Sequence, residues 1–443
     1  GEPMNLSDFA EKTLDLALRA SEQAEVYIAS GWEVPVSFEA NKLKRLEASE
    51  TRGVALRLVA GGKIGLASTT RLEEPEKLVE DALAVAQFGA EAKFELPAEI
   101  PSGGVKIYDP GLSALETEKM VELARGMIEQ VLAAYPEVLC DVGLSKSEGE
   151  VTILNSRGGR AAYRKTLLSA TLHINRIRDT DMLDIYESDA SCFLDLDFKA
   201  LVEKALEKIR LAERIVSPPV GQVPVIFTPK GAAGTLFESL EMALNGKLVW
   251  QGASLLKDRL GEKVFDERIS IYDDGRVEGA VPSVPFDDEG IATRRNALVE
   301  NGVVRAFYYD LQTAGLSGKE STGNAARSLS GHPSPSLHTV IFPPGDTPYK
   351  SMLEDIKEGL LVDQTMGGWA GNTLAGEFSA NVHLGYRVER GELVGRVKDT
   401  MVAGNVFAAL KALAAVGDEA IWVGRSIQIP YLYFPSLGVA SKE

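Results

Sequence analysis

Cysteine and histidine are both scarce in this chain of 443 residues, which limits the chemistry available to it. The two cysteines, Cys140 and Cys192, form no CxxC pair, which argues against a disulfide scaffold and a thiolate zinc site. Cys140 lies at an apolar strand position and is predicted to be a buried thiol. None of the four histidines has a second His or a Glu at metal-binding spacing, and no HExxH motif occurs. We expect His173 at an exposed strand position and His332 and His338 in an exposed loop.

Long apolar runs and a surplus of basic residues are also missing. No stretch approaches about eighteen uninterrupted apolar residues, and Gly1–Met4 show no basic-then-apolar signal pattern, so we expect a cytoplasmic protein without membrane contact. The 64 acidic residues outnumber the 47 basic ones, which gives a formal net charge of −17. Such a field repels phosphate backbones, and the densest basic stretch, Lys42–Arg45, is followed at once by Glu47 and Glu50. We therefore expect no nucleic-acid binding.

Residues 1–216 are predicted to form an N-terminal α+β domain with an internal duplication. A helix over 6–18, alternating strands within 34–38 and 54–66, and a helix opened by Pro75 occupy residues 1–95. A helix ending near Pro136, strands between 138 and 174, and a helix over 198–209 repeat this order within 112–214. We expect Val151 and Ile153 to pair back across a turn at Glu148-Gly149. Because helix, antiparallel strands and helix occur twice, the pattern suggests a structural duplication.

The segment Ser217–Gly221, which contains two prolines, is the clearest boundary in the chain. Residues 222–443 are rich in glycine and in short apolar or alternating runs, so they are predicted to form a β-rich C-terminal domain with a few helices. The expected strands include Val303–Tyr308, Val340–Phe342, Ala380–Tyr386 and Ile427–Phe434, and the expected helices include Lys350–Gly359 and Asn405–Leu413.

No familiar catalytic motif occurs in this C-terminal part. There is no GxSxG elbow, and Gly315–Glu320 lacks the upstream glycine and the spacing of a phosphate-binding loop. The acidic turn Asp287–Glu289 offers ligands to a hard cation, but a lone acidic turn is expected to be solvated.

Two glycine-rich loops remain as candidate binding elements. Glycine lets the backbone approach a ligand closely, although tight turns in a β-rich domain are the simpler interpretation. The candidate residues are Ser321, Thr322, Gly323, Asn324 and Arg327 in the first loop, and Gly367, Gly368, Asn372 and Gly376 in the second.

Several motifs along the chain together resemble one known family. They are Glu50–Arg57 with Gly65–Thr69, Pro285–Gly290 followed by Thr293-Arg294, Ser321–Asn324, and Gly376–Phe378. In this combination, which runs nearly end to end, the chain resembles the TldD/PmbA family, the so-called modulators of DNA gyrase, and specifically its PmbA (TldE) branch.

The resemblance implies a zinc metalloprotease system, implicated in removing leader peptides from modified peptides and in degrading an antitoxin. In this family the TldD-type subunit carries an HExxxH helix and a later cysteine as metal ligands, and the PmbA-type subunit pairs with it and lacks the motif. Where the family's His, Glu and His align, within one residue, this chain has Glu238, Ser239 and Ala243, and Arg425–Ile429 contains no cysteine. The resemblance thus implies no catalytic or metal-binding residue here, and zinc only in a TldD-type partner.

These observations lead to one main hypothesis and two alternatives. The main one is a non-catalytic subunit, in a heterodimer with a TldD-type subunit or a homodimer, that encloses a cleft where an unfolded peptide adds a strand to an exposed sheet edge. The two glycine-rich loops would line that cleft. The first alternative is an autonomous metallopeptidase using Glu238 and Glu241, which lie one helical turn apart, although a surface acidic pair is the simpler interpretation. The second is a regulatory binding protein that contacts DNA gyrase.

Overall fold

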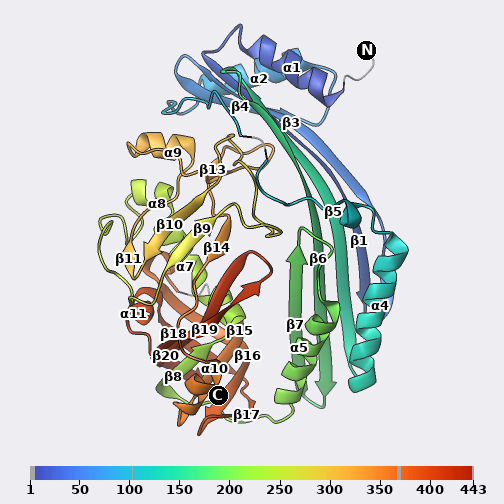
Figure 1. Cartoon of the computed structure of the whole chain (residues 1–443), viewed down its shortest axis with the longest axis vertical. Coiled ribbons are helices and arrows are strands. Elements are labelled where there is room, and N and C mark those ends of the chain that lie inside the picture. Colours follow the sequence, from blue (N-terminus) through green and yellow to red (C-terminus); the bar gives the residue numbers. More distant parts are fainter. Residues whose placement is uncertain (1–4, 102, 367–370, 442–443) are drawn as a thin grey trace.

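The computed structural model describes residues 5–101, 103–366 and 371–441, which form two main β-sheets with helices packed around them (Figure 1). The first sheet contains strands from residues 23–191, and the second contains strands from residues 221–441. The predicted α+β class with a β-rich C-terminal half is therefore confirmed. Among the described residues, no helix is both long and apolar enough to cross a membrane.

Two helix–strands–helix units build the first sheet, whose strand order is β4-β3-β1-β5-β6-β7 with β2 paired to β1. All its pairings are antiparallel. The first unit consists of α1 (Leu6–Ala17), β1 (Gln23–Glu39), β2 (Lys42–Arg45), β3 (Ser49–Ala60), β4 (Lys63–Thr69) and α2 (Pro75–Ala86). The second consists of α3 (Pro110–Ser113), α4 (Thr117–Ala134), β5 (Leu139–Asn155), β6 (Arg160–Arg178), β7 (Asp181–Ser191) and α5 (Phe198–Leu211).

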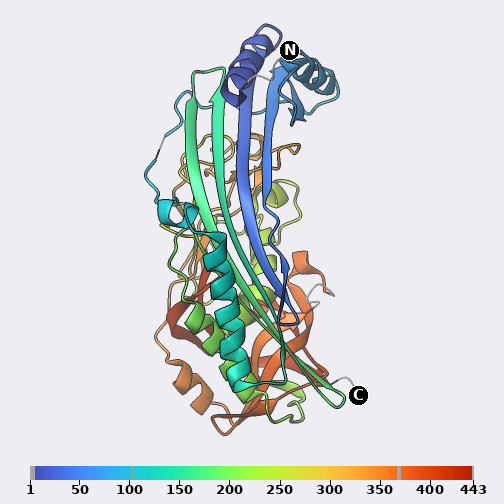
Figure 2. The same cartoon turned by 90° about the vertical axis from the view of Figure 1, so that its right-hand side faces the viewer.

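Helices cover one face of this sheet at both of its ends. On β1, Val26 and Ile28 pack with α1 and α2, whereas Val36 and Phe38 pack with α4 and α5. All four residues have even numbers on this strand, and side chains two positions apart point to the same face, so these four point to one side of the sheet. Figures 1 and 2 show the two helix pairs at opposite ends of the long strands. The other face of the sheet turns toward the C-terminal half.

The predicted turn at Glu148-Gly149 is wrong, because β5 runs through it as one strand of 17 residues. Gly149 is paired with Gly31 of β1 on one side and with Lys165 of β6 on the other. Two neighbouring strands therefore hold this backbone extended, and the local turn propensity is overridden.

The second sheet contains eleven strands within the described residues. The elements of this half are β8 (Gly221–Phe227), α6 (Pro229–Thr235), α7 (Phe237–Leu244), α8 (Gly246–Trp250), β9 (Ile271–Asp274), β10 (Arg295–Glu300), β11 (Val303–Val304), α9 (Leu311–Leu316), β12 (Ala325–Ala326), β13 (Ser334–Pro335), β14 (Thr339–Ile341), α10 (Tyr349–Glu354), β15 (Glu358–Met366), η1 (Thr373–Ala375), β16 (Glu377–Glu389), β17 (Glu392–Arg396), β18 (Thr400–Asn405), α11 (Val406–Lys411), β19 (Ala415–Val423) and β20 (Ile427–Ser441).

Part of this sheet closes on itself. Strand β20 pairs with β18 and also with β8, so β20, β18, β16, β15 and β8 form a closed circuit. Phe227 packs edge-on against Phe378 and Phe434 in the core of this half. Closure leaves few free strand edges for unwanted pairing.

Two of the expected C-terminal elements need correction, and a third is found with slightly shorter bounds. The expected strand Val303–Tyr308 is reduced to the two residues of β11. The helix expected over Lys350–Gly359 ends at Glu354, because Glu358 and Gly359 already pair with β16. The helix expected over Asn405–Leu413 is α11, whose first turn is capped by the Asn405 side chain.

A buried ion network, which we call the upper junction, fixes one end of the first sheet to the C-terminal half. It consists of Glu25, Arg57, Glu289 and Arg327. Arg57 bonds Glu25 at 3.1 Å and Glu289 at 2.6 Å, and Arg327 bonds Glu25 at 3.0 Å. The side chains of Glu25, Glu289 and Arg327 are 0% exposed. Since Glu25 and Arg57 lie opposite each other on β1 and β3, the sheet register itself places this pair.

The acidic turn Asp287–Glu289 is part of this junction, so its expected solvation is wrong. Asp287 and Glu289 are buried. Asp287 accepts backbone N–H bonds from Glu289, Ile291 and Ala325, which take the place of water. Phe286, the preceding residue, packs at 5.2 Å against Tyr163 of β6.

A second ion network, the lower junction, connects the other end of the sheet to the closed strands. Lys208 of α5 bonds Glu187 of β7 and, at 2.7 Å, Asp363 of β15. Burial disfavours the charge of Lys208, but Asp363 and Glu187 more than compensate and raise its pKa. Lys230 of α6 lies 3.8 Å from Glu187. The two junctions thus join the halves through charged groups, and Asp181 at the start of β7 forms further ion pairs with Arg396 and Lys398 of the C-terminal half.

The upper junction should make stability depend on pH. Burial raises the pKa of Glu289 to about 7, against the attraction of Arg57. The native state therefore retains a proton that the unfolded chain loses near pH 4.5, and the free energy of unfolding falls as pH rises from about 4.5 to about 7. We expect Glu289→Gln to remove a decrease on the order of 3 kcal/mol over this range. The free energy of unfolding of both proteins is measured by urea unfolding at several pH values.

The exposed Glu150 on the same sheet provides the control. Glu150→Gln should keep the wild-type pH dependence. Parallel pH profiles for wild type and Glu289→Gln would contradict the assignment.

Candidate functional site

Small side chains occupy the middle of the first sheet, on the face that turns toward the C-terminal half. Two rows of paired residues cross the strands here, and all of their members are half-buried or exposed. We call them the small-residue face: Pro35, Ser145, Ser169 and Ala190 in one row, and Ser37, Gly143, Thr171 and Ser188 in the next. Large apolar residues are the usual occupants of a sheet face that packs on another layer. This face is therefore built to leave room above it.

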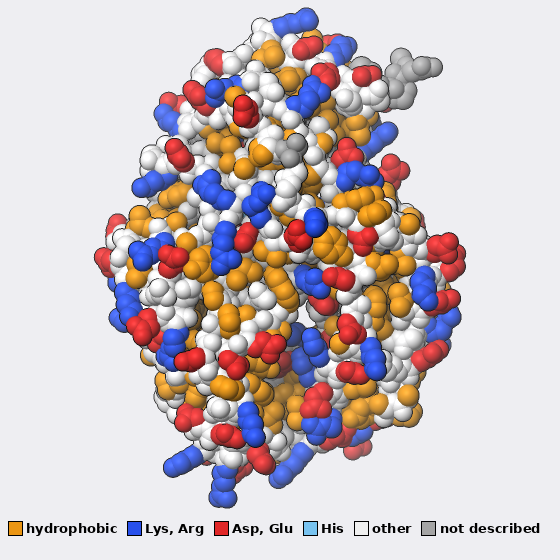
Figure 3. All heavy atoms as spheres, viewed as in Figure 1, with side chains coloured by type: hydrophobic (Ala, Val, Ile, Leu, Met, Phe, Trp, Pro, Cys, Tyr) orange, Lys and Arg blue, Asp and Glu red, His pale blue; other side chains and the backbone are white. Residues whose placement is uncertain are grey.

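The upper and lower junctions lie beyond the two ends of this face. Toward the upper end, Tyr27, Ile153 and Ala161 pack with Phe286 from the C-terminal half. Toward the lower end, the ring of Tyr186 lies 5.6 Å from that of His383 on β16. Figure 1 shows the long strands standing beside the C-terminal half, and the surface in Figure 3 is hollowed near the middle of the molecule.

The β19–β20 hairpin reaches from the C-terminal half to the first sheet. At its tip, Arg425 bonds Asp195, which follows β7, at 3.3 Å. The carbonyl of Arg425 also accepts from the N–H of Val281 at 3.0 Å. Just before the tip, Ile421, Trp422 and Val423 are only half-buried. An apolar hairpin is thus held close to the end of β7.

Three rings border the small-residue face at its lower end: His173, Tyr186 and His383, which we call the histidine row. His173 lies between two carboxylates, with Nδ1 3.1 Å from Asp141 and Nε2 2.7 Å from Asp184. Its ring stacks on Tyr186 at 4.2 Å. The expected exposed position of His173 is therefore wrong, because neighbouring strands supply partners for both nitrogens. Burial opposes ionisation of Asp184, but hydrogen bonds from Asn175 and His173 outweigh it and lower its pKa.

A pocket of about 340 Å³ adjoins this row. Asp184 of β7 contributes to its wall, as do Asn381 and His383 of β16 and Lys398. Burial lowers the pKa of His383, so its neutral form is favoured. The Nε2 atom of His383 and the Oδ1 atom of Asn381 are buried without a partner among the described residues.

The first predicted loop, Ser321–Arg327, lies near the upper junction. Asn324 is fully buried and donates to Asp273 at 2.8 Å, and Thr322 donates to Asn324 at 2.6 Å. Gly323 has a φ of 76°, and its carbonyl lies 2.7 Å from Nε2 of His338. His338 is therefore half-buried, which corrects its expected exposure. The loop is thus held by hydrogen bonds to Asp273 and His338 and by one bond within it.

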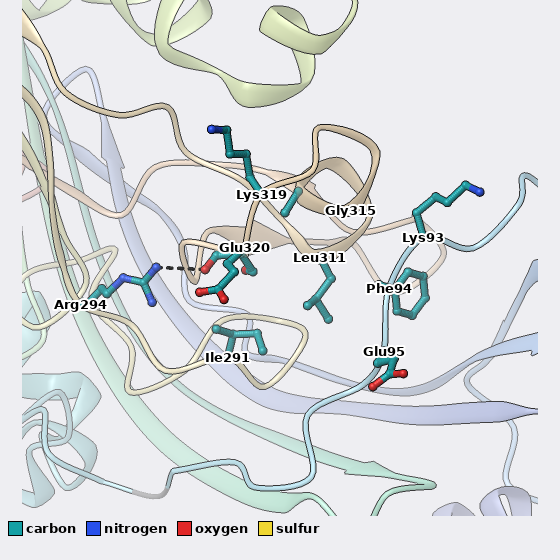
Figure 4. A pocket seen from close by; sticks show the side chains of 11 residues that line it. Lys93, Phe94, Glu95, Ile291, Arg294, Leu311, Gly315, Lys319 and Glu320 are labelled. Carbon is teal, nitrogen blue, oxygen red and sulfur yellow. Dashed lines mark hydrogen bonds between the residues drawn. The ribbon is translucent and has the colours of Figure 1, made fainter. Parts of the chain in front are cut away.

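The start of this loop reaches an open pocket. Ser321 lines a pocket of about 420 Å³ between α9 and residues 93–95. In Figure 4, Arg294 points toward the main chain beside Glu320, where it donates to the Ser321 carbonyl at 3.0 Å. The charged side chains at its rim, Lys93, Glu95 and Lys319, come from both halves of the chain.

The second predicted loop is only partly described. Gly367 and Gly368 lie outside the described residues. Asn372 caps η1, and Gly376 follows it in a left-handed conformation with a φ of 78°. Gly376 packs against Phe407 of α11, where an added Cβ would come within 2.4 Å of the ring. Within the described part, no hydrogen bond joins this loop to Ser321–Arg327.

The helix that aligns with the family's metal helix does not offer a zinc site. In α7, Ser239 and Ala243 are buried in the core, whereas Glu238 is exposed and Glu241 is half-buried. Burial and the charge of Glu238 raise the pKa of Glu241. Among the described residues, no three His, Cys, Asp or Glu side chains are placed to share a metal ion. The residues at this position do not fit zinc, which prefers nitrogen and sulfur donors.

The small-residue face was not predicted from the sequence, although a signal for it exists. Gly143, Ser145 and Ser147 alternate along β5, and Ser169 and Thr171 alternate along β6. Alternating small residues indicate a face without packed bulk, but only the register between strands shows that the two series adjoin.

Comparison with known proteins agrees with this architecture. Family models match three segments: the PmbA/TldA metallopeptidase domain 1 at residues 24–86, its central domain at 110–213 and its C-terminal domain at 220–441. The metalloprotease PmbA homolog of Haemophilus influenzae is 26% identical over 92% of this chain and 90% of its own length.

Two solved structures share the fold. The crystal structure of TldE from Thermococcus kodakarensis is 25% identical, with a TM-score of 0.89 over 98% of this chain and 100% of that one. A putative modulator of a DNA gyrase from Thermotoga maritima is 24% identical, also with a TM-score of 0.89, over 98% of this chain and 100% of its own. With three family models that together span most of its length, the chain belongs to the PmbA/TldD metallopeptidase family.

Proposed function

We propose that this chain is a non-catalytic, PmbA/TldE-like subunit of a cytoplasmic zinc metalloprotease complex that acts on unfolded or leader peptides. Its partner would be a TldD-type subunit, and self-association as a homodimer is the other arrangement. Zinc would be held by the TldD-type subunit.

The observation that carries this proposal is which side chains of α7 could bind a metal ion. Ser239, Leu240 and Ala243 are buried in the hydrophobic core, so this face of the helix serves packing. Glu238 and Glu241 are the carboxylates of α7, and no described His or Cys joins them in a metal-binding group. Without a bound metal ion, water keeps a pKa far above neutrality, and a carboxylate acting as general base contributes about 10²–10⁴-fold. Enzymatic accelerations are at least about 10⁶-fold.

The space between the two halves supports a role in peptide handling. Serine, glycine, alanine and threonine on the small-residue face leave room for an extended chain and offer hydroxyl groups to it. The neighbouring hairpin presents half-buried apolar residues, Ile421 to one side and Trp422 to the other, since successive side chains of a strand alternate between its faces. Such a surface tolerates many sequences, since it depends on main-chain and generic apolar contacts.

The cysteines support a cytoplasmic location. Cys140 and Cys192 are both free and buried, and burial raises the pKa of each thiol. A protein of this size without disulfides fits a reducing compartment.

The isolated protein should bind no stoichiometric zinc. Zinc seldom accepts carboxylates alone, and α7 supplies no His or Cys. Elemental analysis after dialysis measures the metal content, with a TldD-type subunit as the positive control. About one zinc per chain would contradict the proposal.

Peptide cleavage should require the partner. We expect no cleavage of unfolded peptides by this chain alone, and chelator-sensitive cleavage after a TldD-type subunit is added. Glu238→Gln and Glu241→Gln should leave the activity of the complex within a few-fold, because neither carboxylate takes part in the reaction. Robust cleavage by the pure chain, abolished by either replacement, would instead favour an autonomous peptidase.

A bulky side chain on the small-residue face should impair the complex. Thr171 is exposed, so Thr171→Trp fills space above the sheet without creating core strain. We expect cleavage by the complex to fall roughly tenfold or more, because a displaced peptide loses its alignment with the catalytic zinc. Ala162→Trp is the control, since Ala162 is exposed on the opposite face of β6. Equal activity of the two variants would exclude this face from peptide handling.

A further inference from the structure

The outer edge of β19 is an unprotected strand edge. Residues Ala420–Val423 of β19 pair with Ile427–Pro430 of β20, and β19 has no other strand partner within the described residues. The beginning of the strand is covered, because Thr347 and Gly345 bond Val416 and Gly417. Beyond Asp418, no described segment forms backbone hydrogen bonds with this edge of β19.

The register shows which backbone groups point outward. The carbonyl of Gln428 accepts from Phe342, so the backbone groups of Gln428 face β14 and turn away from β19. Residues that face each other in an antiparallel pair without exchanging bonds both turn their backbone groups outward. Trp422 lies opposite Gln428, and its N–H and C=O therefore point to the free side of β19.

Ala420 repeats this arrangement two residues earlier. It lies opposite Pro430, which has no N–H to give. The N–H and C=O groups of Ala420 and Trp422 find no hydrogen-bond partner in the part of the chain that the structure describes. Two residues spaced i, i+2 with free donors and acceptors form the template that an added strand requires.

The side chains leave this edge open. Ala420, Ile421, Trp422 and Val423 are uncharged, half-buried and free of the lysine and proline that often protect natural edge strands. The register shift of β19 lies before Ala420, and the four residues after it pair regularly with β20. The edge of β7 shows the contrast. There Lys230 from α6 donates to the main-chain carbonyl of Tyr186 and blocks pairing at that point.

Charges at the two ends of the segment define the ligand further. Asp418 and Glu419 are exposed and precede the open edge. At the other end, Arg425 is already paired with Asp195. The free charge along this edge is therefore negative and lies at one end, where it would attract a basic residue.

We propose that the edge of β19 at Ala420–Val423 accepts an extended polypeptide segment as an additional β-strand, with apolar residues along the edge and a basic residue beside Asp418 and Glu419. The nature of the ligand, an unfolded chain, rests on the proposed function.

Titration of the isolated full chain with the peptide Lys-Lys-Val-Thr-Val-Thr-Gly tests it. We expect saturable binding and slower hydrogen exchange at the amides of Ala420 and Trp422. Two forms of the peptide, N-methylated at alternating positions, decide the geometry. The pattern that blocks the amides facing β19 should abolish binding, and the other should keep it within a few-fold.

Two substitutions at one position complete the test. Ala420→Pro removes an outward N–H without removing a bond to β20, and should weaken binding about tenfold or more. Ala420→Val keeps this N–H and should bind within a few-fold of wild type. Circular dichroism and thermal unfolding of Ala420→Pro check that it folds, and Trp422→Pro repeats the experiment at the second outward amide.

Three results would overturn the proposal: no saturable binding, equal loss with both methylation patterns, or a dimer in sedimentation that Ala420→Pro disrupts, which would assign the edge to a second copy of the chain. Because these measurements use the isolated chain, they stand apart from the cleavage assay. A failure of the proposed function would appear there as partner-independent or absent cleavage.

Discussion

The buried charges of the upper junction are the constraint on which the arrangement of the two halves depends. Arg57 lies between Glu25 of its own sheet and Glu289 of the other half, and Arg327 returns from that half to Glu25. Removing one partner of such a buried network typically costs about 3–5 kcal/mol, because an unpaired charge remains. Arg57 lies between two carboxylates and Glu25 between two guanidinium groups, so few arrangements of the halves keep all three ion pairs. The junction therefore specifies how the first sheet stands against the C-terminal half, in addition to holding it there.

The space between the halves follows from this constraint. The lower junction and the ion pairs of Asp181 hold the sheet elsewhere, so the rows of the small-residue face need no bulky side chains for packing. Serine, glycine and threonine can occupy these rows because ion pairs and the Phe286 contacts already supply the attachment. The hairpin that carries Trp422 is fixed beside this space by Arg425 and Asp195. A sheet face lined by small, half-buried or exposed side chains is thus available without loss of a core.

Helix α7 keeps its place in the scaffold although it carries no His or Cys. Leu240 and Ala243 pack into the hydrophobic core of the C-terminal half, and Tyr308 donates to the carbonyl of Glu241. The helix is thus maintained by packing and backbone bonding, which do not depend on a metal ion. A family member with this helix can serve binding and assembly while a partner performs the reaction, which is the division of labour that we propose here.

The sequence by itself determined the features that depend on local periodicity and on residue chemistry. The helices α1, α2 and α5, the long strand β6 and the β-rich second half follow from apolar spacing, and the missing zinc ligands follow from the scarcity of His and Cys. Only the tertiary structure decided what depends on distant partners. Strand β5 runs through Glu148-Gly149 because β1 and β6 flank it, and the turn Asp287–Glu289 is buried because Arg57 meets it from another sheet. The small-residue face and the free edge of β19 exist only through strand register, which is set by pairings between residues far apart in the chain, so the alternation of small residues along β5 and β6 does not by itself place them side by side.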